Sequence, residues 1–102
     1  MSKLNGTWNI VLHTYMGDMR SQLAATVEGD RLTGTVTDGA NGATGEISNG
    51  RVEGSKFCYD LTIRAVIGEL TNHLEGEIVD DNTLKGTSEN PMGKFEFEAT
   101  RA

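Results

Sequence analysis

The chain has 102 residues, and 15 acidic side chains against 9 Lys and Arg give it a formal net charge of −6. This length predicts one domain, residues 1–102, and the charge excludes nucleic acid and anionic membrane surfaces as partners, because both require a basic face. The single cysteine excludes an internal disulfide and indicates a reduced, cytoplasmic protein.

Turn signals recur at nearly even intervals and divide the chain into eight segments. They are Met16-Gly17, Gly29-Asp30, Asn41-Gly42, Gly54-Ser55, Ile67-Gly68, Asp81-Asn82 and Met92-Gly93. The segments are 8–14, 19–27, 32–40, 43–52, 57–65, 70–78, 84–90 and 95–101, and strand alternation gives each an apolar face. The pattern predicts an all-β fold, an eight-stranded antiparallel up-and-down (meander) barrel.

The turns also predict the register of the strands. A two-residue turn at Met16-Gly17 pairs Leu12 with Ser21, and the turns at Ile67-Gly68 and Met92-Gly93 are expected to act alike.

Two places need an extra residue. A bulge at Asn49-Gly50 restores the inward parity of the fourth strand. Asp80-Asp81-Asn82 is expected to form a three-residue loop, with Asn82 in the left-handed conformation.

The two halves of the chain resemble each other at an offset near 51 residues. Trp8, Leu12, Gly17 and Leu23 correspond to Tyr59, Ile63, Gly68 and Leu74. We interpret this as an internal two-fold repeat of a four-strand unit that closes on itself, which removes the sheet edges.

Gly6-Thr7-Trp8 opens the first strand, and Arg101 has the same inward parity at the end of the last strand. This pattern resembles that of the calycins, which include lipocalins, fatty-acid-binding proteins and avidins. The resemblance implies that a basic residue lies across the indole and that a small molecule binds inside the barrel. The opening is similar to that of avidins, but residues 9–13 lack their polar biotin contacts and there is no second tryptophan, so biotin is not the expected ligand.

Polar residues on the inward face gather near the end that carries the turns at residues 17, 42, 68 and 93, which we call the glycine end. This pattern predicts a site for a small, largely apolar or amphipathic molecule, without a cofactor. The predicted ligand-binding residues are Leu12, Thr14, Met19, Ser21, Asp38, Ile63, Leu70, Asn72, Ser88, Asn90, Phe95 and Phe97. The alternative is a wet, partly open barrel end with Asp38 in solvent.

The turns at the glycine end are apolar, whereas those at the opposite end are polar. Their apolar residues, which we call the rim, are Tyr15, Met16, Val66, Ile67, Pro91 and Met92. Such a patch indicates a ligand entrance or the interface of a homodimer or higher homo-oligomer. The alternative is a lid that seals the core, in which case the protein is a structural or oligomerisation module with a filled core.

An enzyme is the remaining alternative. Asp38 would be the catalytic residue, a general acid or base in a cofactor-independent isomerase, cyclase or hydratase. Asn72 and Ser21 would donate hydrogen bonds to a developing oxyanion.

No metal site is expected. His13, His73 and Cys58 face outward by parity, and no pair of them has the spacing of metal ligands. Thr62, not Cys58, is expected opposite His73.

Overall fold

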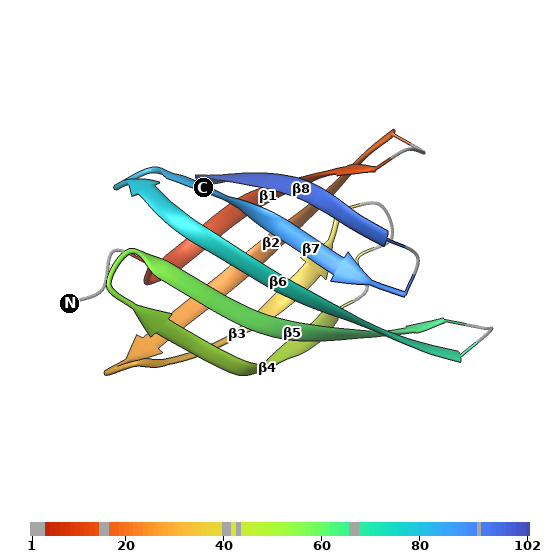
Figure 1. The fold of residues 1–102 in the computed structure, drawn as a ribbon, viewed down its shortest axis with the longest axis horizontal. Helices are drawn as coiled ribbons and strands as arrows, with labels where there is room; N and C mark the ends of the chain where they lie inside the picture. Colours follow the sequence, from red (N-terminus) through yellow and green to blue (C-terminus); the bar gives the residue numbers. More distant parts are fainter. Residues whose placement is uncertain (1–3, 15–16, 40–41, 43, 66–67, 92) are drawn as a thin grey trace.

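The computed structural model is all β, and its eight strands close into one antiparallel barrel (Figure 1). It describes residues 4–14, 17–39, 42, 44–65, 68–91 and 93–102, with the backbone only at residues 63–65 and 70. The strands are β1 (Gly6–Thr14), β2 (Gly17–Glu28), β3 (Arg31–Asp38), β4 (Thr44–Glu53), β5 (Lys56–Ala65), β6 (Gly68–Asp80), β7 (Thr83–Asn90) and β8 (Gly93–Arg101). Each strand pairs with the next and β8 pairs with β1, so the predicted up-and-down barrel is confirmed. Within the described ranges, no helix is long and apolar enough to cross a membrane.

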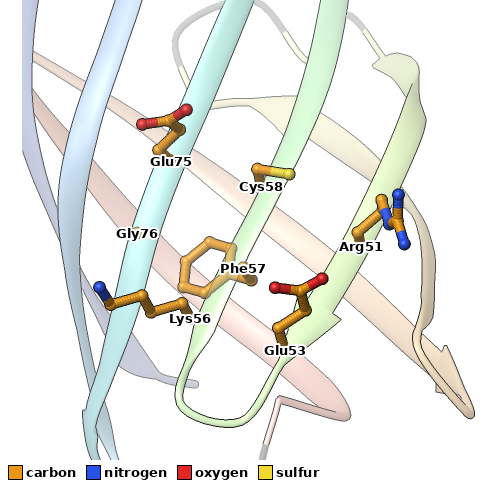
Figure 2. Close-up of a pocket in the computed structure, with 7 residues that line it drawn as sticks. All are labelled: Arg51, Glu53, Lys56, Phe57, Cys58, Glu75 and Gly76. Carbon is orange, nitrogen blue, oxygen red and sulfur yellow. The ribbon is translucent and has the colours of Figure 1, made fainter.

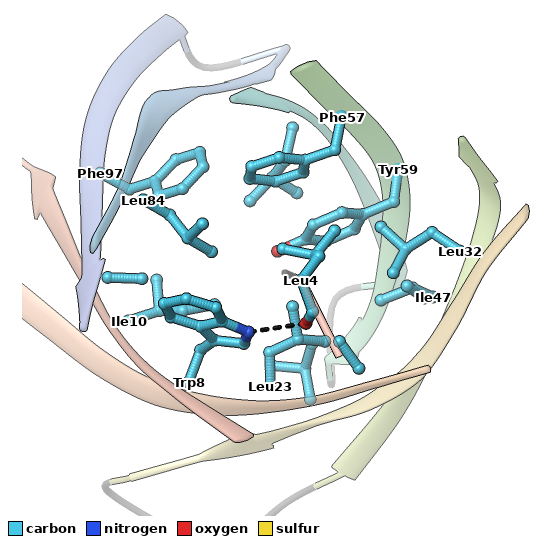
Figure 3. Packing of buried hydrophobic residues seen from close by; sticks show 14 residues of the cluster. Leu4, Trp8, Ile10, Leu23, Leu32, Ile47, Phe57, Tyr59, Leu84 and Phe97 are labelled. Carbon is cyan, nitrogen blue, oxygen red and sulfur yellow. Dashed lines mark hydrogen bonds between the residues drawn. The ribbon is translucent and has the colours of Figure 1, made fainter. Parts of the chain in front are cut away.

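Alternation along each strand sends every second side chain into the barrel. In β1, Trp8 and Ile10 are buried, whereas their neighbours Thr7 and Asn9 are exposed. The buried apolar residues form one cluster (Figure 3): Leu4, Trp8, Ile10, Leu23, Ala25, Leu32, Val36, Ile47, Phe57, Tyr59, Leu74, Leu84, Phe97 and Ala99. Because apolar burial contributes roughly 25 cal/mol per Å², this shared interior is the main source of stability.

Three hairpins at the glycine end have a register two residues away from the predicted one. Leu12 pairs with Met19 instead of Ser21, and the β5–β6 and β7–β8 hairpins shift in the same way. The cause is the glycine, because Gly17 pairs with Thr14 at the start of β2, with a φ of 109°, instead of completing the turn. Glycine adopts this φ without steric cost. A shift of two residues changes the partners but keeps each side chain on its predicted face.

The predicted bulge in the fourth strand is confirmed. The pairing of β4 with β5 slips between Ser48 and Arg51, and Asn49 has a φ of 52°. Asparagine tolerates this left-handed conformation better than most residues. The slip lets β4 direct both Ile47 and Val52 toward the interior.

The predicted three-residue loop at Asp80–Asn82 is wrong. Asp80 pairs with Thr83, so the loop has two residues, and the extra residue is Val79 within β6. Asn82 has no positive φ. Its backbone NH instead donates to the Asp80 side chain at 2.8 Å, which holds the turn without a left-handed residue.

Two inward glycines make room for two phenylalanine rings of the core. Gly76 on β6 and Gly86 on β7 are Cα partners, and Phe57 on β5 and Phe97 on β8 pair with them from either side. The two ring centroids are 6.5 Å apart. A Cβ on Gly86 would lie 2.6 Å from the Gly76 Cα and 2.8 Å from the Phe97 ring. Only glycine therefore fits at this position.

The opposite end of the barrel, which we call the tryptophan end, is closed by side chains. Trp8 and Leu4 have no exposed surface, and Leu4 lies near the centre of the ring of strands (Figure 3). Trp8 Nε1 donates to the Leu4 carbonyl oxygen at 2.9 Å. The Arg101 guanidinium carbon lies 4.3 Å from the centre of the indole ring, so the predicted stacking is confirmed. Arg101 also donates to the carbonyl oxygens of Asp81 and Asn5, at 2.9 and 2.8 Å.

The hairpins β1–β2 and β5–β6 pair corresponding residues, that is, residues related by the offset of about 51 positions between the two halves of the chain. Trp8 pairs with Leu23, and Tyr59 pairs with Leu74. The duplication of a four-strand unit itself stays a prediction.

Candidate functional site

The residues predicted to line the glycine end come from every strand except β4. Asn72, Ser88 and Phe97 are buried. The half-buried ones are Leu12, Thr14, Ser21, Asp38, Asn90 and Phe95. Ile63 and Leu70 pair through their backbones in the β5–β6 hairpin, and their side chains lie outside the described part of the chain.

Met19 and Thr14 lie near the mouth of the barrel. Met19 is 53% exposed, although it lies on the same face as its Cα partner Leu12. The pairing of β2 with β3 ends at Ser21 and Asp38, and the β1–β2 hairpin continues beyond it (Figure 1). The Thr14 hydroxyl donates to the Gly17 carbonyl oxygen at 2.6 Å, which supports the hairpin.

Two asparagines meet inside the barrel at the seam between β6 and β7. Asn90 Nδ2 donates to Asn72 Oδ1 at 2.7 Å. Asn72 is 7% exposed, and Ser88 on the same face of β7 is 2% exposed. No buried side-chain nitrogen or oxygen among the described residues lacks a hydrogen-bond partner. This matters because an unpaired buried polar group costs roughly 1–3 kcal/mol.

The second polar pair, Ser21 and Asp38, lies at the seam between β2 and β3. The two residues are Cα partners and both are half-buried. Ser21 alternates with buried Leu23 and Asp38 alternates with buried Val36, so both belong to the inward face. In the ring of eight strands this seam is diametrically opposite the β6–β7 seam. The predicted polar residues therefore form two pairs, which lie on opposite seams of the barrel.

On β1 and β8, burial decreases along the inward face toward the glycine end. On β1, Trp8 is 0% and Ile10 is 5% exposed, and Leu12 is half-buried. On β8, Ala99 and Phe97 are buried, and Phe95 is half-buried. The inward faces of these two strands are therefore more accessible near the glycine end. On β6 the order is reversed, because Asn72 and Leu74 are buried and Gly76 and Ile78 are half-buried.

Leu4 closes the tryptophan end, a role that the sequence did not predict. It precedes the first strand, where alternation gives no information. The available signal was a single apolar side chain among polar ones, four residues before Trp8.

His13 bridges two carboxylates on the outer wall, where parity places it. Its Nδ1 lies 2.9 Å from Asp18 Oδ1, and its Nε2 lies 3.0 Å from Glu98 Oε1. The hydrogen bonds to Asp18 and then Glu98 raise the pKa of His13 above its ordinary value. All three groups are exposed, so these pairs contribute little to stability.

His73 makes a similar bridge on β6. Its Nδ1 lies 2.6 Å from Asp60, and its Nε2 lies 3.1 Å from Glu75. These hydrogen bonds raise the pKa of His73, whereas hydrogen bonds from Asn49 and His73 lower the pKa of Asp60. The Cα partner of His73 is Asp60. The prediction that Thr62 lies opposite His73 is therefore wrong, by the same two-residue shift of the hairpin. No cluster of three or more His, Cys, Asp or Glu in the described ranges is arranged to hold a metal ion.

The outer wall carries grooves that the sequence did not predict. One, of about 320 Å³, crosses β4, β5 and β6 (Figure 2) and is lined by Arg51, Glu53, Lys56, Phe57, Cys58, Glu75 and Gly76. Four of these side chains are charged, two of each sign, and Phe57 is 4% exposed.

No protein-family model and no curated protein sequence matches the chain. Two solved structures resemble it. A redesigned beta barrel, b11L5F_LGL, has a TM-score of 0.78 and 12% identity, over 98% of this chain and 92% of that chain. A redesigned beta barrel, mFAP1, bound to DFHBI, has a TM-score of 0.69 and 14% identity, over 98% of this chain and 95% of that chain. At these identities the likeness shows the barrel fold alone.

Proposed function

We propose that this protein binds a small, largely apolar molecule inside the barrel, which the molecule enters through the glycine end. The observation that carries the proposal is the two polar pairs, Asn72 with Asn90 and Ser21 with Asp38, on an inner surface that is mostly apolar. A mostly apolar cavity with a few convergent polar groups is the usual form of a small-molecule site. The closed tryptophan end leaves the glycine end as the entrance.

The apolar walls of this site come from β1 and β8. Leu12 pairs with Phe97 across the seam between these two strands. Phe95 follows on the same face of β8 and is half-buried. Leu12 and Phe95 are half-buried, so both would lose exposed apolar area on contact with an apolar ligand. Burial of this area contributes roughly 25 cal/mol per Å² to binding.

Two further observations support the proposal. The mFAP1 barrel shares this fold and is bound to the small dye DFHBI, so a barrel of this fold and length is able to bind such a molecule. The stacking of Arg101 on Trp8 at 4.3 Å favours a relationship to the calycins, which the sequence motif implied.

A variant that fills the interior tests the proposal. Gly45 is paired with Val36, and a Cβ there would lie 3.3 Å from a methyl group of Leu61. Gly45→Leu therefore adds bulk inside the barrel, whereas Glu46→Leu adds the same side chain on the outer wall as the control. DFHBI and a panel of hydrophobic dyes would be screened by thermal shift, with circular dichroism as the check of folding.

We expect at least one dye to stabilise the wild type and the Glu46→Leu variant but not the Gly45→Leu variant. If no dye stabilises the wild type, or if a dye stabilises the filled variant equally, the interior is not the binding site.

We also propose self-association through the rim. Pro91, which belongs to the rim, is exposed, and the other five rim residues lie outside the described part of the chain. Light scattering during size-exclusion chromatography tests this: a dimer is expected, and a monomer at high concentration contradicts it.

A further inference from the structure

We infer that the Tyr59 hydroxyl donates a hydrogen bond to the ligand of the proposed site, and that this ligand is an uncharged carbonyl compound such as an aryl ketone. The inference rests on the proposed function, and it names the chemical class of the ligand. Tyr59 on β5 is 1% exposed, and Figure 3 shows its phenol ring directed into the interior, with the hydroxyl toward the middle of the ring of strands. The phenol therefore presents a polar atom to the apolar core of the barrel.

The Tyr59 hydroxyl has no hydrogen-bond partner within the described part of the chain, whereas the Trp8 indole in the same core bonds to the Leu4 carbonyl. Every fully enclosed side-chain nitrogen or oxygen of the described residues does have a partner. The hydroxyl therefore keeps part of the small exposed surface of Tyr59, and it borders space inside the barrel. A buried hydroxyl without a partner is costly, and an acceptor on a ligand would remove that cost.

Packing and burial make this hydroxyl a fixed, neutral donor. The rings of Tyr59 and Phe57 are stacked, with their centroids 6.3 Å apart and their planes at 11°. Burial raises the pKa of Tyr59, so the hydroxyl keeps its proton at neutral pH. A hydrogen bond from such a donor is stronger in the low-dielectric interior than in water.

One row of paired residues joins Tyr59 to the glycine end. Tyr59 pairs with Leu74, which pairs in turn with Ser88 on β7. Ser88 pairs with Phe95, which is half-buried and lies two residues from Gly93, where β8 begins. A ligand that enters at the glycine end and follows this row places its apolar part against Phe95 and Leu74, and its inner end reaches Tyr59.

The surroundings of the hydroxyl favour an uncharged acceptor. Tyr59 belongs to the cluster of buried apolar side chains, where an ionised group without a counter-charge would lose its hydration. The Arg101 guanidinium is stacked on Trp8 and already donates to two backbone carbonyl oxygens. The net charge of −6 also repels anions. A ketone oxygen accepts from Tyr59 without these penalties, and the rest of such a ligand is apolar.

Three probes that share a benzene ring test the inference. Acetophenone, ethylbenzene and benzoate carry a carbonyl, a methylene and a carboxylate beside the ring. Their dissociation constants would be measured by calorimetry for the wild type and for Tyr59→Phe, which removes only the hydroxyl. The matched control is Thr71→Val, which removes a hydroxyl from an exposed position on the outer face of β6, where it bonds to Thr62 at 3.1 Å.

We expect Tyr59→Phe to weaken the binding of acetophenone about tenfold, which corresponds to about 1.4 kcal/mol, without weakening that of ethylbenzene. Thr71→Val should leave both affinities unchanged, and the wild type should bind benzoate most weakly. In the wild-type complex, the carbonyl carbon resonance of acetophenone should lie downfield of its position in cyclohexane, because a hydrogen bond withdraws electron density from that carbon.

The outcomes separate the two proposals. If Tyr59→Phe weakens acetophenone and ethylbenzene equally, or weakens neither, Tyr59 does not bind the ligand, but the interior site stands. A wild type that binds benzoate most tightly, or that binds dyes or ethylbenzene but not acetophenone, overturns the carbonyl class. If no probe and no dye binds, the proposed function itself is wrong. Should Tyr59→Phe fail to fold by circular dichroism, the carbonyl resonance decides: a downfield shift supports the inference, and an unshifted resonance overturns it.

Discussion

Replacing Gly86 by alanine tests the packing at the centre of the barrel. An added Cβ would lie 2.6 Å from the Gly76 Cα and 2.8 Å from the Phe97 ring, and it would overlap the Glu75 carbonyl oxygen. Two of these neighbours are backbone atoms, which cannot rotate away. The φ of Gly86 lies outside the left-handed region, so a steric effect and not backbone strain would be measured.

The expected magnitude follows from two opposing effects. Alanine is better than glycine within a strand by roughly 0.5–1 kcal/mol where there is room. Overpacking a close-packed interior costs roughly 1–3 kcal/mol, and occasionally more. Because backbone atoms must shift here, we expect Gly86→Ala to lower the free energy of unfolding by about 2 kcal/mol. For a domain of this size, that lowers Tm by about 10 °C.

Urea unfolding followed by the fluorescence of the single tryptophan would measure the change, and Gly45→Ala is the matched control. A Cβ on Gly45 meets only the flexible end of Leu61, at 3.3 Å, and the Thr62 carbonyl oxygen at 3.7 Å. We expect this control to stay within about 0.5 kcal/mol of the wild type or to be slightly more stable. Equal stability of Gly86→Ala and Gly45→Ala would refute the packing argument.

Three other predictions concern the tryptophan end and the outer wall. Leu4→Ala should lower the free energy of unfolding, measured with urea, by about 2–4 kcal/mol. It should also shift the tryptophan emission to longer wavelength, and an unchanged emission would show that Leu4 does not close the barrel. Arg101→Met should lower the free energy of unfolding by about 2 kcal/mol. The control Arg51→Met removes an exposed ion pair with Asp30 and should lower it by less than about 0.5 kcal/mol. Equal losses would contradict the role of the stacking. The pKa values of His13 and His73 are raised in the folded state. Their ion pairs with the neighbouring carboxylates therefore stabilise the fold below pH 6.5, and this stabilisation is lost as pH rises through the folded-state pKa values. An NMR titration that places both histidine pKa values at or below 6.5 would contradict this.

The fold could be predicted because its signals are local. Turn residues recur at even spacing, and alternation assigns each residue to a face without knowledge of its partner. The bulge at Asn49-Gly50 could also be predicted, because without it Ile47 and Val52 cannot both face inward.

The partners across the glycine-end hairpins could not be predicted, because parity does not distinguish registers that differ by two residues. Whether Gly17 completes a turn or begins a strand depends on its φ. The sequence does not determine this angle, because glycine adopts positive and negative φ values about equally well.

For the site, alternation correctly placed Asn72, Ser88 and Phe97 in the interior. It did not predict the exposure of Met19, which lies beyond the last paired residue of the neighbouring strand β3. Strand length, unlike strand parity, depends on where the neighbouring chain turns. The side chains of Ile63 and Leu70 remain predictions.

The seam between β1 and β8 sets the order in which the chain can assemble. The contacts across it include a hydrogen bond from Arg101 to Asn5, 96 positions apart in the chain, and such distant contacts are the slowest to form. Before this seam closes, the sheet has two unpaired edges, which invite association with other chains. Trp8 lies at the seam, beneath Arg101 and bonded to Leu4, so the kinetics of its fluorescence report the step at which the open sheet becomes a ring.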